Sequence, residues 1–190
     1  PVARISKAML RRASERLLGT TDLDAGELRR MDDHDLLVAL RTTPATEAFA
    51  ERYDERRLFK RAVWAELQDV PDELLDLDHD ELRELEATIA DRADVPEKTV
   101  IIEIPEKPSM RESSTRVVVN GESRNLSAQS PLVNALRTTQ RGQWRLGVYT
   151  TPSAADRVGQ LAAAELGLDI TGGLVTESRQ GIHATLDEFE

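Results

Sequence analysis

Residues 56–61 read Arg-Arg-Leu-Phe-Lys-Arg, and the sequence changes character at this point. Before it, apolar residues recur at helical spacing. After it, short runs rich in β-branched residues alternate with helical segments, a pattern typical of strands and helices that pack together. The quoted stretch therefore marks the boundary between a helical first third and a part of the chain that contains a sheet.

Three helices are expected before this boundary. In residues 2–18 the apolar residues fall near helical spacing, with arginines on the other face. Asp32 or Asp33 can cap a second helix, and Pro44 can open a third that runs to about residue 56, because proline is favoured in a first turn. The buried face of the second helix would consist of Leu36, Leu37 and Leu40.

Four strands and three further helices are expected after the boundary. Asn120-Gly121 is a strong hairpin signal, because both central residues of a type I′ turn need a positive φ. Asp78, followed three residues later by Glu81, forms the sequence pattern of a capping box. The expected strands cover residues 58–64, 99–104, 115–119 and 143–150. The expected helices cover residues 78–93, 131–139 and 152–166.

These elements predict an α+β protein with a small mixed sheet and helices packed mainly on one face of it. We divide the chain into a helical segment (residues 1–57), an α+β domain (58–170) and a tail of unassigned structure (171–190).

Composition limits the class of protein. The chain has 190 residues, no cysteine and a formal net charge of −10. The absence of cysteine excludes disulfides, thiolate metal sites and a cysteine nucleophile. No apolar run reaches the roughly 18 residues that a membrane span needs, so we expect a cytoplasmic protein. Acidic residues with arginine in place of lysine suit a salt-rich cytoplasm, where ions screen self-repulsion.

Charge is unevenly distributed along the chain. Residues 66–94 hold twelve acidic residues against Arg83 and Arg92, whereas residues 1–18 hold five basic residues against Glu15. The two blocks have opposite sign, so the first helix and the basic residues near position 56 are expected to face something anionic.

The basic stretch itself is a candidate phosphate site. Arg56, Arg57 and Lys60 surround an apolar Leu58-Phe59 pair, and Arg52 extends the cluster by one helical turn. Arginine can grip phosphate oxygens with two parallel hydrogen bonds, and lysine acts as a point charge. The alternative is that Arg52 and Arg56 pair within the helix. The acidic partners within reach would be Glu51, Asp54 and Glu55.

Several collinear segments resemble a known family. They are Lys-Ala-Met-Leu in the first helix, Arg-Met-Asp-Asp-His-Asp-Leu-Leu before the second, Arg-Arg-Leu-Phe-Lys-Arg-Ala, Ile-Glu-Ile-Pro-Glu-Lys-Pro-Ser-Met, and Gln-Trp-Arg-Leu-Gly-Val-Tyr at 143–149. Together they resemble the region downstream of the catalytic core in HD-domain phosphohydrolases related to the SAM-and-HD-domain deoxynucleoside triphosphate triphosphohydrolases. The resemblance covers roughly residues 1–150.

The resemblance implies that the catalytic chemistry lies outside this chain. In the family, histidines and aspartates in the pattern H…HD…D hold a divalent metal in an upstream core, and residues 1–57 would continue from that core. Arg56 and Lys60 match positions that line an effector nucleotide site between subunits. The resemblance therefore implies a homo-oligomer with a (d)NTP effector, no cofactor in this chain and a divalent metal upstream.

The histidines are weak candidates for a metal site. His34-Asp35 and His79-Asp80 each lie at an expected helix start beside a capping aspartate, where the helix dipole favours acidic residues, and His183 lies in the unassigned tail. Binding of nucleic acid is not expected, because aromatic residues for base stacking are scarce. A membrane partner is not expected either. Trp144 and Tyr149 are expected in the core.

We therefore predict the assembly and regulatory portion of a metal-dependent HD-type phosphohydrolase acting on (deoxy)nucleoside triphosphates. A free-standing α+β oligomerisation or interaction module without enzymatic activity is the alternative. A nucleic-acid-binding accessory domain is a third hypothesis, and its affinity would fall steeply with salt.

Overall fold

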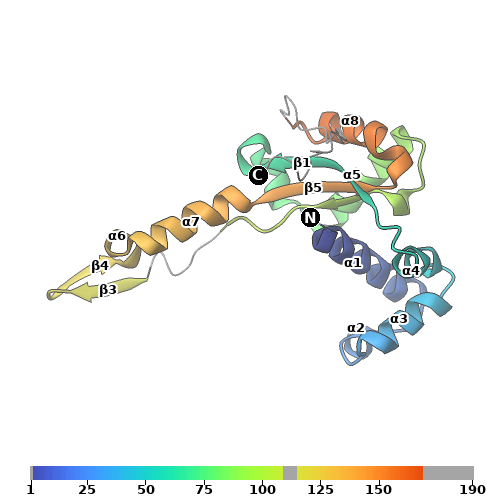
Figure 1. The fold of residues 1–190 in the computed structure, drawn as a ribbon, viewed down its shortest axis with the longest axis horizontal. Coiled ribbons are helices and arrows are strands. Elements are labelled where there is room, and N and C mark those ends of the chain that lie inside the picture. The colour runs from blue at the N-terminus through green and yellow to red at the C-terminus, as the bar shows by residue number, and fades with distance from the viewer. Residues whose placement is uncertain (1, 109–114, 169–190) are drawn as a thin grey trace, which may run out of the picture.

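The computed structural model describes residues 2–108 and 115–168 and places a small sheet between two groups of helices (Figure 1). The α+β class is confirmed. The first group of helices is α1 (Val2–Thr20), α2 (Ala25–Leu28), α3 (Asp33–Thr42) and α4 (Glu47–Asp54). The helices that follow are α5 (His79–Arg92), α6 (Leu126–Gln129), α7 (Pro131–Gln143) and α8 (Ala155–Glu165). Short 3₁₀ helices are η1 (Leu67–Asp69), η2 (Asp72–Asp76), η3 (Glu97–Thr99) and η5 (Pro152–Ala154).

Local capping explains where two of the helices begin. Asp32, and not Asp33, caps α3, because its carboxylate accepts a hydrogen bond of 2.8 Å from the Asp35 N–H. The predicted capping box of α5 is confirmed: the Asp78 carboxylate accepts from the Glu81 N–H at 2.9 Å, and Glu81 accepts from the Asp78 N–H at 2.8 Å. Both bonds satisfy donors that a helix leaves free in its first turn.

The main sheet has three strands in the order β1-β5-β2. The strands are β1 (Lys60–Glu66), β5 (Arg145–Thr150) and β2 (Ile101–Glu103). Strand β5 lies in the centre and is antiparallel to both neighbours. The sheet is therefore antiparallel, and the expectation of a mixed sheet was wrong. The register shifts between Arg61 and Val63, so that Ala62 forms a bulge in β1.

Helices cover both faces of this sheet. Successive strand residues point to opposite faces, so Leu146 and Val148 of β5 join one apolar cluster with α5 and α8, while Tyr149 joins another with α1, α3 and α4. Helices α5 and α8 share one face and α1 packs against the other, so the expectation that helices pack mainly on one face was wrong. The helical first third is thus anchored to the sheet, through Phe59 and Ile101 as well as Tyr149.

A second, two-stranded sheet belongs to an arm that projects from the rest of the molecule (Figure 1). We define the arm as residues 115–143, which contain β3 (Arg116–Val119), β4 (Glu122–Asn125), α6 and α7. Asn120 and Gly121 have φ values of 52° and 83°, which confirms the predicted hairpin turn. None of the residues in these four elements is buried.

Several boundaries differ from the predictions. Helix α4 begins at Glu47 and not at Pro44. Residues 44–46 form a turn, in which the Thr46 hydroxyl donates to the Leu40 carbonyl at 2.8 Å. Helix α7 continues to Gln143, four residues further than expected. Strand β5 therefore begins at Arg145 and not at residue 143. The short helix α2 was not among the predicted helices. The tail 171–190 lies outside the described residues.

Candidate anion-binding site

The basic stretch connects α4 to β1, and its backbone makes a tight turn at Arg56. Arg56 has a φ of 56°, in the left-handed region, and its N–H donates to the Tyr53 carbonyl at 3.1 Å. This conformation ends α4 and turns the chain toward the sheet. The Arg56 side chain is exposed and makes no hydrogen bond or ion pair with any residue that the structure describes.

Burial of Phe59 places Lys60 at the surface. Phe59 is 2% exposed, its N–H contacts the Met9 sulfur at 3.3 Å, and its ring lies 6.1 Å from that of Phe49. Because Phe59 points into the core, the next residue along an extended chain points outward. Lys60 is accordingly exposed, and it is the first residue of β1, opposite Thr150 of β5.

Arg57 is engaged in ion pairs. Its guanidinium pairs with Glu51, at 3.2 Å, and with Glu55. The pairing predicted for Arg52 and Arg56 with these acids is therefore made by Arg57 instead. A phosphate at Arg57 would have to displace both carboxylates.

Asp54, the remaining acid within helical reach of Arg52 and Arg56, pairs with an arginine of another helix. Asp54 pairs with Arg41 of α3 at 2.6 Å. The hydrogen bond from Arg41 lowers the pKa of Asp54 and raises that of Arg41. The two side chains are exposed, so this pair contributes little stability.

A small hollow of about 60 Å³ lies beside the basic stretch. Arg52 reaches over the Phe59 ring, 5.2 Å from its centroid, and donates to the Arg57 carbonyl at 3.3 Å. Lys98, from η3, lines the hollow on another side. The remaining lining residues are Ala48, Phe49 and Thr99. Sequence reasoning missed Lys98, because it lies far from residue 56 along the chain and only the fold brings it there.

The arrangement can hold an anion at the surface, with apolar rings behind the cations. Exposed Arg56 and Lys60 supply two positive charges, and Arg52 and Lys98 supply two more around the hollow. Guanidinium groups can bind phosphate oxygens in pairs. The hollow itself is too small for a nucleotide, which would have to lie across the open surface.

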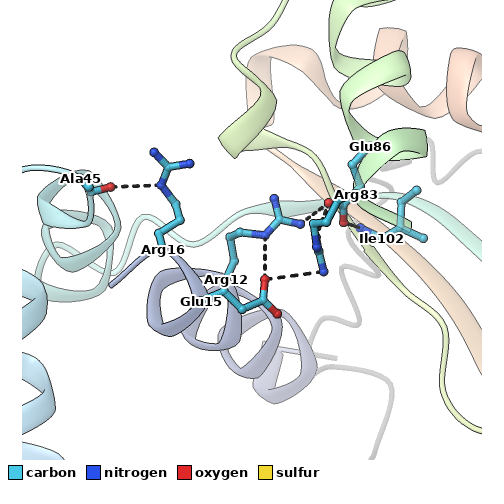
Figure 2. A network of polar contacts seen from close by, with 7 residues as sticks. All are labelled: Arg12, Glu15, Arg16, Ala45, Arg83, Glu86 and Ile102. Atoms are coloured by element: carbon cyan, nitrogen blue, oxygen red, sulfur yellow. Dashed lines mark hydrogen bonds and ion pairs between the residues drawn. The ribbon is translucent and has the colours of Figure 1, made fainter. Parts of the chain in front are cut away.

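A buried charge network joins α1 to the sheet and to α5 (Figure 2). Arg12 of α1 is 5% exposed and forms an ion pair with Glu86 of α5, which is 1% exposed. Glu86 also pairs with Arg83 and accepts a hydrogen bond of 2.7 Å from the Ile102 N–H of β2. Glu15 completes the network, 3.4 Å from Arg12 and 3.7 Å from Arg83.

Burial dominates the electrostatics of this network. Desolvation raises the pKa of Glu86 to about 7, while the Arg12 charge and the Ile102 N–H work in the opposite direction. The sequence analysis counted Glu86 only as one acid of the block 66–94, so its burial was missed. A signal was present: Glu86 lies at helical spacing with Leu82 and Ile89, on the apolar side of α5.

A second polar group lies on the α1 face of the sheet. Trp64 has the guanidinium groups of Arg4 and Arg61 at 4.7 Å and 4.9 Å from its ring centroid. Arg4 pairs with Glu103 at 3.0 Å, and the Tyr149 hydroxyl donates to the same carboxylate at 2.8 Å. An open groove of about 400 Å³ lies next to it. The charged lining residues are Arg4, Lys7, Glu103, Glu106 and Arg145.

Trp144 and Tyr149 have the core positions that were predicted. Tyr149 is fully buried, and the Trp144 indole N–H donates to the Pro105 and Glu106 carbonyls, both at 3.1 Å. Neither ring is available for stacking on a ligand.

The histidines do not come together in the described part of the chain. His34 lies in the first turn of α3 and His79 is the first residue of α5, both exposed. Within residues 2–108 and 115–168, no group of three or more histidine, aspartate or glutamate side chains could hold a metal ion. His183 lies outside the described residues. No helix among the described residues is long and apolar enough to cross a membrane.

Comparison with known families gives one match. The model of the family described as HD associated region matches residues 1–177. A search of the curated proteins finds no match to the chain. The family match covers the first helices, the sheet and the arm together, and it agrees with the resemblance to the region downstream of an HD core. The salt-rich cytoplasm stays a prediction.

Proposed function

This chain belongs to the HD associated region family, and from that premise we propose that it is the assembly and regulatory portion of an HD-type phosphohydrolase. The parent enzyme would hydrolyse (deoxy)nucleoside triphosphates at a divalent metal held by the HD core, outside this chain. The family match supports the association with HD-domain proteins, and the collinear motifs support the choice of a phosphohydrolase.

The regulatory part of the proposal rests on Arg56. Its exposed guanidinium has no partner among the described residues, and the left-handed turn holds it at the junction of α4 and β1. Lys60 would add a second charge from the start of β1. Arg57 would join only if a phosphate displaced Glu51 and Glu55. An arginine and a lysine together can bind the phosphate of a (d)NTP.

Such a surface site is open on one side, so a nucleotide bound there would expose the rest of its surface. A second subunit could cover it, and the nucleotide would then join two protomers. Binding energy shared between two subunits makes assembly depend on nucleotide concentration. This is how the chain would couple an effector to assembly of the parent enzyme.

The test is the double variant Arg56→Ala/Lys60→Ala in the parent protein, with assembly followed by light scattering as (d)NTP is added. We expect nucleotide-dependent assembly to be lost. Arg29→Ala/Arg30→Ala, which removes two exposed arginines away from the site, is the matched control and should assemble normally. Unchanged assembly in the Arg56/Lys60 variant would rule out the effector role.

The family assignment is tested separately by the parent gene. An H…HD…D pattern encoded upstream of the codon for Pro1 would support a catalytic core. A start codon immediately upstream would favour the alternative, an interaction module without enzymatic activity. The projecting arm is the observation that favours that alternative, and such a module would assemble irrespective of nucleotide.

A further inference from the structure

The arm exposes apolar side chains that neither core covers. Val118 is 75% exposed, Leu132 is 68% exposed and Leu136 is 48% exposed. Leu132 and Leu136 are four residues apart on α7, so they lie on one face of the helix. No arm residue belongs to either of the two apolar clusters of the described chain. We call Leu132 and Leu136 the apolar stripe of the arm.

An arm of this kind gains stability from a partner. An isolated two-stranded hairpin is marginally stable in water, and it needs a further layer to pack against. The elements of the arm pack chiefly on one another. Helix α6 contacts both α7 and β4, and β3 pairs with β4. Its 29 residues match the roughly 20–30 residues that each side of a specific protein interface contributes.

The charge of the arm indicates what the partner looks like. The arm holds four arginines and one glutamate, a net charge of +3 in a chain of −10. Arg137 and Arg141 are four residues apart on α7, on a different side of the helix from Leu132 and Leu136, because successive helical residues are about 100° apart around the axis. A partner surface that fits the arginines would therefore be acidic, with apolar area next to the acids to cover the leucines.

The same chain carries such a surface on η2 and α5, which we call the acidic face. Its exposed members are Asp72, Glu73, Asp76, Asp78, Asp80, Glu81 and Glu84. Leu74, Leu75 and Leu77 are partly exposed among them. Asp80 and Glu84 are four residues apart on α5, the same spacing as Arg137 and Arg141. Only Lys107 pairs with these acids in the described part of the chain, at 3.4 Å from Asp76 and 3.9 Å from Asp72.

In Figure 1 the hairpin of the arm lies at the far end of the molecule from α5, so the hairpin cannot reach the acidic face of its own molecule. We propose that the arm docks on the acidic face of a second copy of this chain, and that the second copy returns its own arm in the same way. A reciprocal exchange buries the apolar stripe twice and pairs both charge patterns, as a closed two-fold dimer requires.

This inference identifies a surface for the assembly role of the proposed function, but it needs neither nucleotide nor a catalytic core. It is tested on the 190-residue chain alone, so its failure leaves the effector site untouched, and loss of the effector site leaves the dimer intact. The measurement is sedimentation equilibrium without nucleotide, from which the dissociation constant of the dimer is obtained.

Two charge-reversed variants provide the central test. Arg137→Glu/Arg141→Glu reverses the arm, and Asp80→Arg/Glu84→Arg reverses the acidic face. Each alone should weaken the dimer at least about tenfold, because like charges then meet at both copies of the interface. An equimolar mixture should recover the wild-type affinity, because every arm then meets a face of opposite charge. Recovery on mixing is specific to reciprocal docking.

Controls separate docking from loss of fold. Leu132→Asp/Leu136→Asp should also abolish the dimer, whereas Val38→Asp, at an exposed valine of α3, should not. Circular dichroism must show unchanged helix content in each variant. A monomeric wild type, or a dimer that the arm variants leave unchanged, would overturn the proposal. So would a monomer that binds a random-sequence DNA duplex through Arg137 and Arg141.

Discussion

Replacing Arg12 by alanine leaves a buried carboxylate without its main partner. Arg12 and Glu86 are 5% and 1% exposed, and breaking such a pair typically costs about 3–5 kcal/mol. Arg83 and the Ile102 N–H still contact Glu86 after the change. We therefore expect a loss near the lower end of that range, about 3 kcal/mol in the free energy of unfolding.

The pH dependence of this loss follows from Glu86. Its pKa in the folded protein is raised from 4.5 to about 7. A carboxyl whose pKa is raised on folding contributes stability that is fully present below its unfolded pKa and is lost as pH rises through the folded value. Arg12 lowers that pKa, so its removal raises it further. The penalty of Arg12→Ala should therefore increase as pH rises above about 7.

Urea unfolding followed by circular dichroism, at about pH 5.5, 7 and 8.5, measures the penalty. The neighbouring exposed Arg11 offers a matched control: Arg11→Ala should cost less than about 0.5 kcal/mol at every pH. If Arg12→Ala costs no more than Arg11→Ala, the buried network does not hold α1 to the sheet. A penalty that is constant with pH would show that Glu86 does not change its charge over this pH range.

Gly147→Ala should destabilise the fold by about 1–3 kcal/mol, because a Cβ at this position would lie 2.6 Å from the Tyr149 hydroxyl oxygen. An unchanged urea midpoint would mean that the Tyr149 ring moves aside freely. Arg56→Gly should leave the free energy of unfolding unchanged or raise it by up to about 1 kcal/mol, since glycine accepts the positive φ at this position. The same change removes the proposed phosphate contact. A clear loss of stability would contradict the left-handed turn at Arg56. Burial raises the pKa of both Tyr53 and Tyr149 above 10.0, so ultraviolet absorbance should detect little tyrosinate at that pH in the folded protein; half-ionised tyrosines would refute their burial.

Features set by neighbouring residues were predictable from the sequence. The capping box at Asp78 and the hairpin turn at Asn120-Gly121 each need only a few adjacent residues of particular types. Both are present in the structure as predicted. The general order of helices and strands was predictable for the same reason, because apolar periodicity is a local property.

Features set by distant residues were not predictable. The central position of β5 depends on pairing with strands that lie far away along the chain, and no local pattern distinguishes an antiparallel from a mixed sheet. Lys98 reaches the hollow beside Arg52 only through the fold. The burial of Glu86 was not predicted because its partner Arg12 lies in another helix, 74 residues away. The basic residues Arg56 and Lys60 were found because they are neighbours in sequence.

The position of β5 also affects the order of folding during synthesis. Among the described strands, β1 and β2 bond only to β5, whose Arg145 lies 79 residues after its contact Glu66. Both apolar clusters include residues of β5, so neither can be completed until residue 150 has left the ribosome. Until then the first hundred residues expose strand edges and apolar helix faces. Formation of the sheet should be slow, because its strand pairings join residues that are far apart in sequence, and a nascent chain that stalls before β5 would be a target for chaperones or proteases.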